Sequence, residues 1–136
     1  MDTPGGVNGE AAARGLILVA EDDAGIRTLL ARLMSWRGYE VIVAADGLEA
    51  VALARGRRPD IVLLDISMPG KSGIEVLGEL APDMPGTGFI MVTGNADEEL
   101  ARRCLELGAC DYLPKPMDLD GLADTVEARL RVRPPV

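Results

Sequence analysis

The sequence contains no histidine at all. This absence excludes sites built on a Ser-His-Asp or Cys-His arrangement, and it removes the most common protein ligand for zinc. The two cysteines, Cys104 and Cys110, lack the spacing of a zinc site, and we expect both to be buried as small apolar side chains. Chemistry in this protein must therefore come from carboxylates, hydroxyls, lysine or a hard metal ion.

Positive charge and long hydrophobic runs are scarce as well. The chain has 14 Lys and Arg against 22 Asp and Glu, a net charge of −8, and such a surface repels nucleic acids. No apolar run approaches the roughly 18 residues of a membrane span. Residues 1–14 lack the features of a secretory signal and are expected to form a flexible tail. These features predict a cytoplasmic protein that binds neither nucleic acid nor membrane.

The rest of the chain alternates between two hydrophobic periods. Over residues 15–131, five short apolar runs are separated by stretches of helical periodicity. We assign these residues to one domain and expect residues 132–136 to be a C-terminal tail or a truncated linker. The runs are Leu16–Ala20, Tyr39–Ala44, Ile61–Leu64, Phe89–Val92 and Tyr112–Leu113. Three of them (LILVA, IVLL and FIMV) are continuous, which is typical of strands buried on both faces of a parallel sheet.

Each helical stretch carries apolar residues three or four positions apart. The first of these stripes consists of Ile26, Leu29, Leu30, Leu33 and Met34, and the second begins with Leu48, Val51 and Ala52. Five strands alternating with five helices imply right-handed crossovers and a parallel sheet covered on both faces. We therefore predict an α/β fold of the flavodoxin-like, doubly wound type with strand order 2-1-3-4-5, with another order of α/β layers as the alternative.

Polar residues follow four of the five runs. Glu21 and Asp22 follow the first, Asp65 the third, Thr93 the fourth and Lys115 the fifth. In a doubly wound sheet these positions meet outside the carboxyl ends of the strands. Three converging carboxylates repel one another unless a cation joins them, and an all-oxygen ligand set suits Mg²⁺. The pattern predicts a phosphoryl-accepting site with Asp65 as nucleophile and with Thr93 and Lys115 at the phosphate oxygens.

Each of these residues has a simpler explanation when it is taken alone. The acids at 21–23 suit the N-terminus of a helix, Asp65 suits a turn, and Thr93 suits a helix cap. Lys115 suits a solvated loop, and Tyr112 a half-buried strand. It is their joint appearance, each after the appropriate strand, that favours a functional site.

The sequence resembles the receiver domains of two-component response regulators. The resemblance covers roughly residues 14–131 and is carried by ILVAEDDAGIRTLL (17–30), IVLLDISMPGKSGIEVL (61–77), FIMVTGNAD (89–97) and GACDYLPKPMDLDGL (108–122). It implies that Asp65 is the phosphoacceptor. It also implies that Glu21, Asp22, Asp65 and the backbone carbonyl of Ser67 bind Mg²⁺, with Glu21 standing where aspartate is most common.

The resemblance assigns roles to the remaining site residues. Thr93 is the switch hydroxyl, Lys115 the phosphate-contacting lysine and Tyr112 the switch aromatic. The Lys115–Pro116 peptide bond is often cis in this family. Gly94 is small, which should leave the site open.

The implied function is that of a signalling receiver rather than an ordinary enzyme, one that assists its own phosphorylation and a slow hydrolysis of the aspartyl phosphate. The donor is a sensor histidine kinase or a histidine phosphotransfer protein, because this chain supplies no histidine. The face formed by the fourth helix, fifth strand and fifth helix would control an output domain, a protein partner or a phosphorylation-dependent homodimer.

Two alternatives remain open. The first is a docking module that works without phosphorylation. The second is an aspartyl-phosphate hydrolase of another α/β family, but such enzymes commonly place a second acid where this chain has Ser67.

Overall fold

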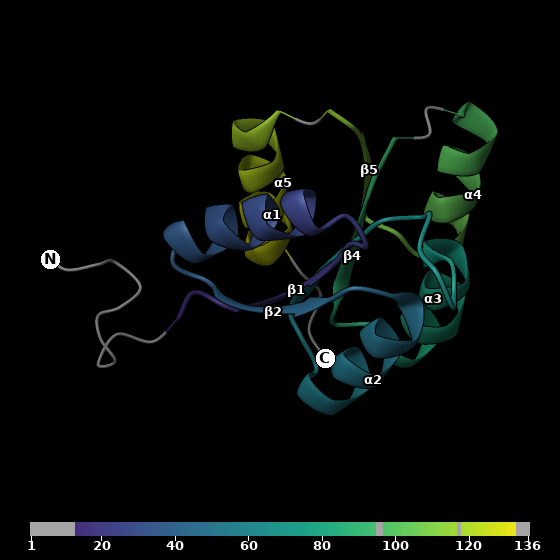
Figure 1. Ribbon diagram of the computed structural model, residues 1–136, viewed down its shortest axis with the longest axis horizontal. Helices are drawn as coiled ribbons and strands as arrows, with labels where there is room; N and C mark the ends of the chain where they lie inside the picture. The colour runs from purple at the N-terminus through teal and green to yellow at the C-terminus, as the bar shows by residue number, and fades with distance from the viewer. Residues whose placement is uncertain (1–12, 95–96, 117, 133–136) are drawn as a thin grey trace, which may run out of the picture.

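A computed structural model describes residues 13–94, 97–116 and 118–132 of the chain. Within these residues a five-stranded parallel sheet lies between two layers of helices (Figure 1). The predicted tails, 1–14 and 132–136, fall largely outside the described residues. Arg14 is described. Its backbone N–H donates to the Gly38 carbonyl, and its guanidinium pairs with the Glu127 carboxylate at 2.8 Å, so the folded region begins before residue 15.

Strands and helices alternate along the whole domain. The strands are β1 (Leu16–Ala20), β2 (Glu40–Ala44), β3 (Ile61–Leu64), β4 (Gly88–Thr93) and β5 (Asp111–Pro114). The helices are α1 (Ala24–Trp36), α2 (Gly47–Arg57), α3 (Gly73–Leu80), α4 (Glu98–Leu107) and α5 (Leu119–Arg131), with a short 3₁₀ turn η2 (Ala81–Asp83) after α3. All five predicted strands are present, and their ends lie within one residue of the predicted bounds.

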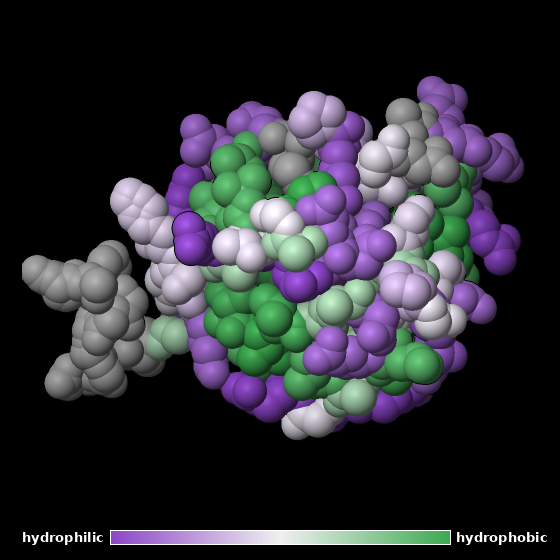
Figure 2. All heavy atoms as spheres, in the orientation of Figure 1, coloured by the Kyte–Doolittle hydropathy of each residue, from purple (hydrophilic) through white to green (hydrophobic). Residues whose placement is uncertain are grey.

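The strand order is β2-β1-β3-β4-β5, and every neighbouring pair is parallel. This confirms the predicted fold class and strand order. All residues of β3 and β4 are buried, in agreement with their continuous apolar sequences. Strand β2 forms one edge of the sheet, where Val43 is 41% exposed. Figure 2 shows a hydrophobic area between α1 and α2 on this side of the molecule.

The sheet separates two hydrophobic cores. Helices α1 and α5 cover one face, and α2, α3 and α4 cover the other (Figure 1). Successive residues of the central strands point to opposite cores, so Leu63 packs with Leu30 and Leu122, whereas Leu64 packs with Leu77 and Phe89. The two cores hold the central strands rigidly and thereby fix the positions of the residues that follow them.

The buried faces of α1 and α2 differ from those predicted. Leu29 is 45% exposed, although Leu30 beside it is buried, and Leu48 is 60% exposed. In α2 the residues against the sheet are Ala50 and Ala54. The prediction failed there because the buried side chains are small, so the large apolar residues of α2 do not mark its inner face.

Some local expectations also need correction or refinement. Cys104 is buried as predicted, but Cys110 is exposed, because it lies in the turn before edge strand β5. Asp118 is the N-cap residue of α5, but its side chain makes no capping hydrogen bond. Trp36, at the C-terminal end of α1, is 66% exposed. None of the helices in the described ranges has the length and apolar character needed to cross a membrane.

Candidate functional site

A crevice lies at the carboxyl ends of the central strands. It has a volume of about 550 Å³, and its walls come from the ends of β1, β3, β4 and β5 together with the start of α1. Its lining residues are Glu21, Asp22, Asp23, Ile26, Asp65, Ser67, Thr93, Gly94 and Lys115. The five residues predicted from the strand ends therefore line one cavity, although they come from four separate parts of the sequence.

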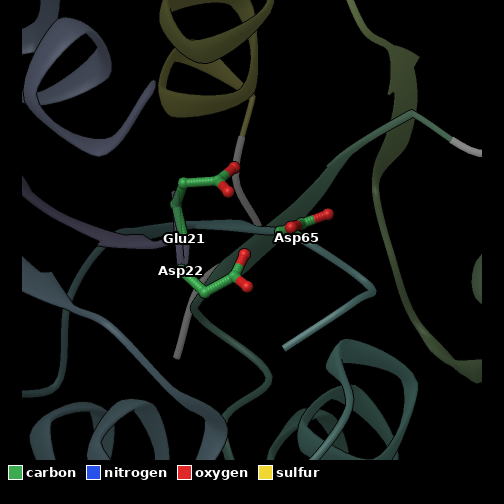
Figure 3. A group of neighbouring side chains, drawn as sticks. All are labelled: Glu21, Asp22 and Asp65. Atoms are coloured by element: carbon green, nitrogen blue, oxygen red, sulfur yellow. The ribbon is translucent and has the colours of Figure 1, made fainter. Parts of the chain in front are cut away.

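Three carboxylates meet in this crevice. Glu21, Asp22 and Asp65 each offer an oxygen, and these oxygens lie within 4.8 Å of one another. Figure 3 shows Glu21 and Asp22 extending from the end of β1 towards the side of Asp65. The backbone sets this arrangement, because the Asp65 N–H donates to the Ala20 carbonyl at 3.0 Å and so continues the ladder between β3 and β1.

The three acids differ in their exposure to solvent. Glu21 is 2% exposed and Asp65 5% exposed, whereas Asp22 is exposed. Burial raises the pKa of Glu21, and the charge of Asp65 raises it further, although Lys115 and the N–H of Asp23 oppose the rise. Repulsion between the acids therefore contributes to the raised pKa of Glu21, but burial is the larger cause.

Lys115 provides positive charge beside the acids. Its Nζ lies 2.7 Å from Oε1 of Glu21 and 3.5 Å from Oδ2 of Asp65. Burial opposes the charged form of Lys115, but the hydrogen bond to Glu21 and the charges of Asp65 and Glu21 outweigh it and raise the pKa of the lysine. The amine is therefore charged at neutral pH and lies closer to Glu21 than to the predicted phosphoacceptor.

The remaining predicted residues surround this centre. Thr93 is 1% exposed at the end of β4, where its carbonyl accepts the backbone N–H of Lys115 at 2.8 Å. Ser67 lines the crevice and is exposed. A Cβ added to Gly94 would have no described atom within 4 Å, so the site is open there, as expected, and alanine would also fit.

Tyr112 lies in β5, outside the crevice. It is half-buried and packs against the core beneath α2, α3 and α4. Burial raises the pKa of its hydroxyl, with smaller contributions from Cys104 and Asp97. Its position on the sheet edge, beside α4, is compatible with the predicted role as a switch residue.

Helix α1 supports the acids through contacts that were not predicted from the sequence. Arg27 donates from Nη1 to the backbone carbonyls of Glu21 at 2.9 Å and Asp22 at 3.3 Å. The side chain of Asp23 caps α1 by accepting the N–H of Ile26 at 3.0 Å. No residue type signals this contact in the sequence, because Arg27 binds backbone carbonyls, which any residues at positions 21 and 22 would present.

The segment after β3 is also held by backbone contacts. The Gly73 N–H donates to the Ile66 carbonyl at 2.7 Å, and a Cβ on Gly73 would overlap the Asp65 carbonyl oxygen. Ser72 and Glu75 form a capping box at the start of α3. The Lys115–Pro116 peptide bond is cis, as the resemblance implied.

The donor set fits a hard divalent cation. Three carboxylate oxygens face one crevice, and two of the acids are buried with only partial neutralisation by Lys115. Oxygen ligands of this kind match the preference of Mg²⁺, which takes few carboxylates and keeps several waters. Because the crevice is open, a site here would have room for water or for a phosphoryl group.

Comparison with known proteins gives a consistent result. The family model for the response regulator receiver domain matches residues 17–127. The chain is 35% identical over 117 residues to sporulation initiation phosphotransferase F of Bacillus subtilis, covering 86% of this chain and 94% of that protein. It is 39% identical over 115 residues to response regulator MprA of a Mycobacterium species, covering 85% of this chain but only 50% of MprA.

A solved structure supports the same relationship. The CheX-CheY-BeF3-Mg²⁺ complex from Borrelia burgdorferi contains a chain that matches this one with a TM-score of 0.84 at 29% identity. The match covers 97% of this chain and 100% of that chain. Sequence and fold therefore agree on one family.

Proposed function

Because this chain belongs to the response regulator receiver domain family, we propose that Asp65 is the residue that accepts the phosphoryl group. Receiver domains serve in two-component signalling, and a phosphorylatable aspartate and Mg²⁺ binding are general to the family. The observation that carries the proposal is the position of Asp65, buried at the end of central strand β3 among two further acids and the amine of Lys115.

We assign the metal ligands to the acids of the crevice. Glu21, Asp22 and Asp65 would hold Mg²⁺ together with the backbone carbonyl of Ser67. When bound, the ion would supply positive charge that stabilises the phosphoryl oxygens. The structural neighbour solved with BeF3 and Mg²⁺ supports this choice of cation. The longer side chain of Glu21, in place of the more common aspartate, would change the affinity more than the chemistry.

The proposed transfer is a displacement at phosphorus. A carboxylate oxygen of Asp65 attacks the phosphorus of a phosphohistidine, the oxygen–phosphorus bond forms, and the nitrogen–phosphorus bond breaks. The donor imidazole leaves and takes a proton from solvent. This histidine belongs to a kinase or phosphotransfer protein, since the chain has none. Lys115 and the hydroxyl of Thr93 then bind the new phosphate oxygens. Hydrolysis by water would slowly reverse the modification.

Signal output would follow from that rearrangement. Phosphorylation adds about −1.5 to −2 charges and three acceptor oxygens at Asp65. Movement of Thr93 towards the phosphate would favour an inward position of the Tyr112 side chain. This would shift an existing equilibrium between two conformations of the α4–β5–α5 face. Glu98, Arg102, Arg103 and Glu106 are exposed on α4 and available to an output domain, a protein partner or a second copy.

The test is labelling by a small phosphodonor such as acetyl phosphate, with and without Mg²⁺, followed by intact-mass analysis. We expect one phosphoryl group on the wild-type protein with Mg²⁺ and none on Asp65→Asn. The matched control is Asp46→Asn, which follows edge strand β2 outside the crevice and keeps its N-cap, because asparagine also caps helices. Stoichiometric labelling of Asp65→Asn would exclude Asp65 as the acceptor, and a wild-type protein that neither binds Mg²⁺ nor is labelled would favour the phosphorylation-independent docking module.

A further inference from the structure

Helix α2 supplies no side chain to the crevice, but its first residue touches the loop that follows the phosphoacceptor. Gly47 is buried at the start of α2, and its N–H donates to the Pro69 carbonyl at 3.2 Å. That N–H is one of the donors that a helix cannot satisfy internally. The same carbonyl also accepts the N–H of Lys71 at 3.0 Å, so the helix end and the loop share one acceptor.

The two backbones are in direct contact at this point. A Cβ added to Gly47 would overlap the carbonyl oxygen of Lys71 and would lie 2.5 Å from the Cβ of that residue. Gly47 does not have a positive φ, so it is required for space rather than for its backbone conformation. Any larger residue would push α2 and the loop apart.

The loop is fixed in the same way at its other end. Gly73, the first residue of α3, packs against the backbone carbonyl of Asp65. Ion pairs add a further connection between the loop and the two helices. Nζ of Lys71, in the loop, pairs with Glu79 of α3 at 2.9 Å, and Arg55 of α2 lies 3.7 Å from the same carboxylate. The residues from Asp65 to Gly73 are thus held between the first turns of two helices.

We propose that Gly47 is a positioning residue for the phosphorylation site. Its close contact with Lys71 holds the loop 66–72 in place, and this loop carries the Ser67 carbonyl assigned to Mg²⁺. Edge helix α2 is therefore part of the support of a site that it does not line. The proposal rests on the assignment of Asp65 and the metal ligands made above.

The experiment compares Gly47→Ala with Gly56→Ala, which lies in the same helix and has no described atom within 4 Å of an added Cβ. For Gly47→Ala we expect faster hydrogen exchange of the backbone amides in residues 66–73. We also expect the Mg²⁺ affinity to fall by about tenfold, which is the scale seen when groups that orient metal ligands are removed. Labelling by acetyl phosphate at limiting Mg²⁺ should be correspondingly slower. Saturating Mg²⁺ should restore most of the rate. Gly56→Ala should match the wild type in all three measurements.

A second variant decides the question if Gly47→Ala does not fold. Lys71→Met keeps the aliphatic stem but removes the ion pair with Glu79, and we expect a smaller loss of exchange protection and Mg²⁺ affinity in the same direction. A folded Gly47→Ala, or failing that Lys71→Met, with wild-type loop exchange and Mg²⁺ affinity would overturn the proposal. If the wild type itself binds no Mg²⁺ and is not labelled, the proposed function fails, but the exchange data still test the contact between Gly47 and the loop.

Discussion

The amine of Lys115 lies 2.7 Å from Glu21 and 3.5 Å from Asp65, so the lysine is bound first by an acid assigned to the metal and only second by the phosphoacceptor. Both acids are also assigned to Mg²⁺, so the lysine and the cation share two carboxylates. Each reduces the negative charge that attracts the other, and phosphorylation of Asp65 would draw the lysine away from Glu21.

Replacement of this lysine should make stability depend on the metal. For Lys115→Met without metal we expect the free energy of unfolding to fall by about 1–2 kcal/mol, less than for a fully buried pair because the lysine side chain is 17% exposed. Mg²⁺ should stabilise the variant more than the wild type, since the site loses a competing cation. Urea unfolding followed with and without Mg²⁺ measures both effects. Arg103→Met on the exposed face of α4 is the control, and an equal loss with and without Mg²⁺ would contradict the prediction.

Arg27 should affect the metal site without touching its carboxylates. In Arg27→Met the loop 21–23 loses the donor that joins the carbonyls of Glu21 and Asp22 to α1. We expect Mg²⁺ affinity to fall by about tenfold, because the carboxylates are less well oriented. Calorimetric titration measures the change, with Arg32→Met on the exposed side of the same helix as control. Equal affinities for the two variants would show that the contact with Arg27 is dispensable.

Neighbouring leucines of α1 should differ sharply in their effect on stability. Leu30 is 1% exposed, whereas Leu29 is 45% exposed. Leu30→Ala should lower the free energy of unfolding by about 3 kcal/mol through lost burial and a cavity, and Leu29→Ala by about 1 kcal/mol or less. Denaturation followed by circular dichroism provides the comparison. Similar losses for both variants would mean that α1 is rotated relative to the arrangement described above.

The two cysteines should react at different rates. Burial raises the pKa of the Cys104 thiol, and its side chain is inaccessible, whereas Cys110 is exposed. Because the thiolate is the reactive form, brief alkylation of the native protein at pH 8 should modify Cys110 and spare Cys104. Peptide mass analysis identifies the modified residue, and unfolded protein, in which both should react, is the control. Rapid native labelling of Cys104 would contradict its burial on the inner side of α4.

The sequence was sufficient to predict the fold and the convergence of the candidate site residues, because both depend on strand positions. Asp65 and Lys115 follow different strands, yet parallel strands end at one edge, so their convergence needs no knowledge of side-chain conformation. Continuous apolar runs located β1, β3 and β4 for a similar reason, since a strand buried on both faces has little freedom in composition.

Other features depend on contacts that no local pattern specifies. The pairing of Lys115 with Glu21 is a matter of side-chain conformation, and the contact of Gly47 with Lys71 depends on how the start of α2 meets the loop after β3. Leu48 was placed on the apolar stripe of its helix because of its spacing from Val51 and Ala52, but alanines form the buried face of α2. Size and periodicity predict which segments form helices more reliably than which side of a short helix is covered.

Trp36 has a practical consequence for spectroscopy. It is the single tryptophan of the chain, and two thirds of its surface is in contact with solvent in the native state, at the end of α1 far from the acids. Its emission should therefore change little when the protein denatures or when magnesium is added. The emission of the same indole should shift to shorter wavelengths when another molecule covers that end of the helix. Trp36 is therefore an intrinsic fluorescent probe of association rather than of folding.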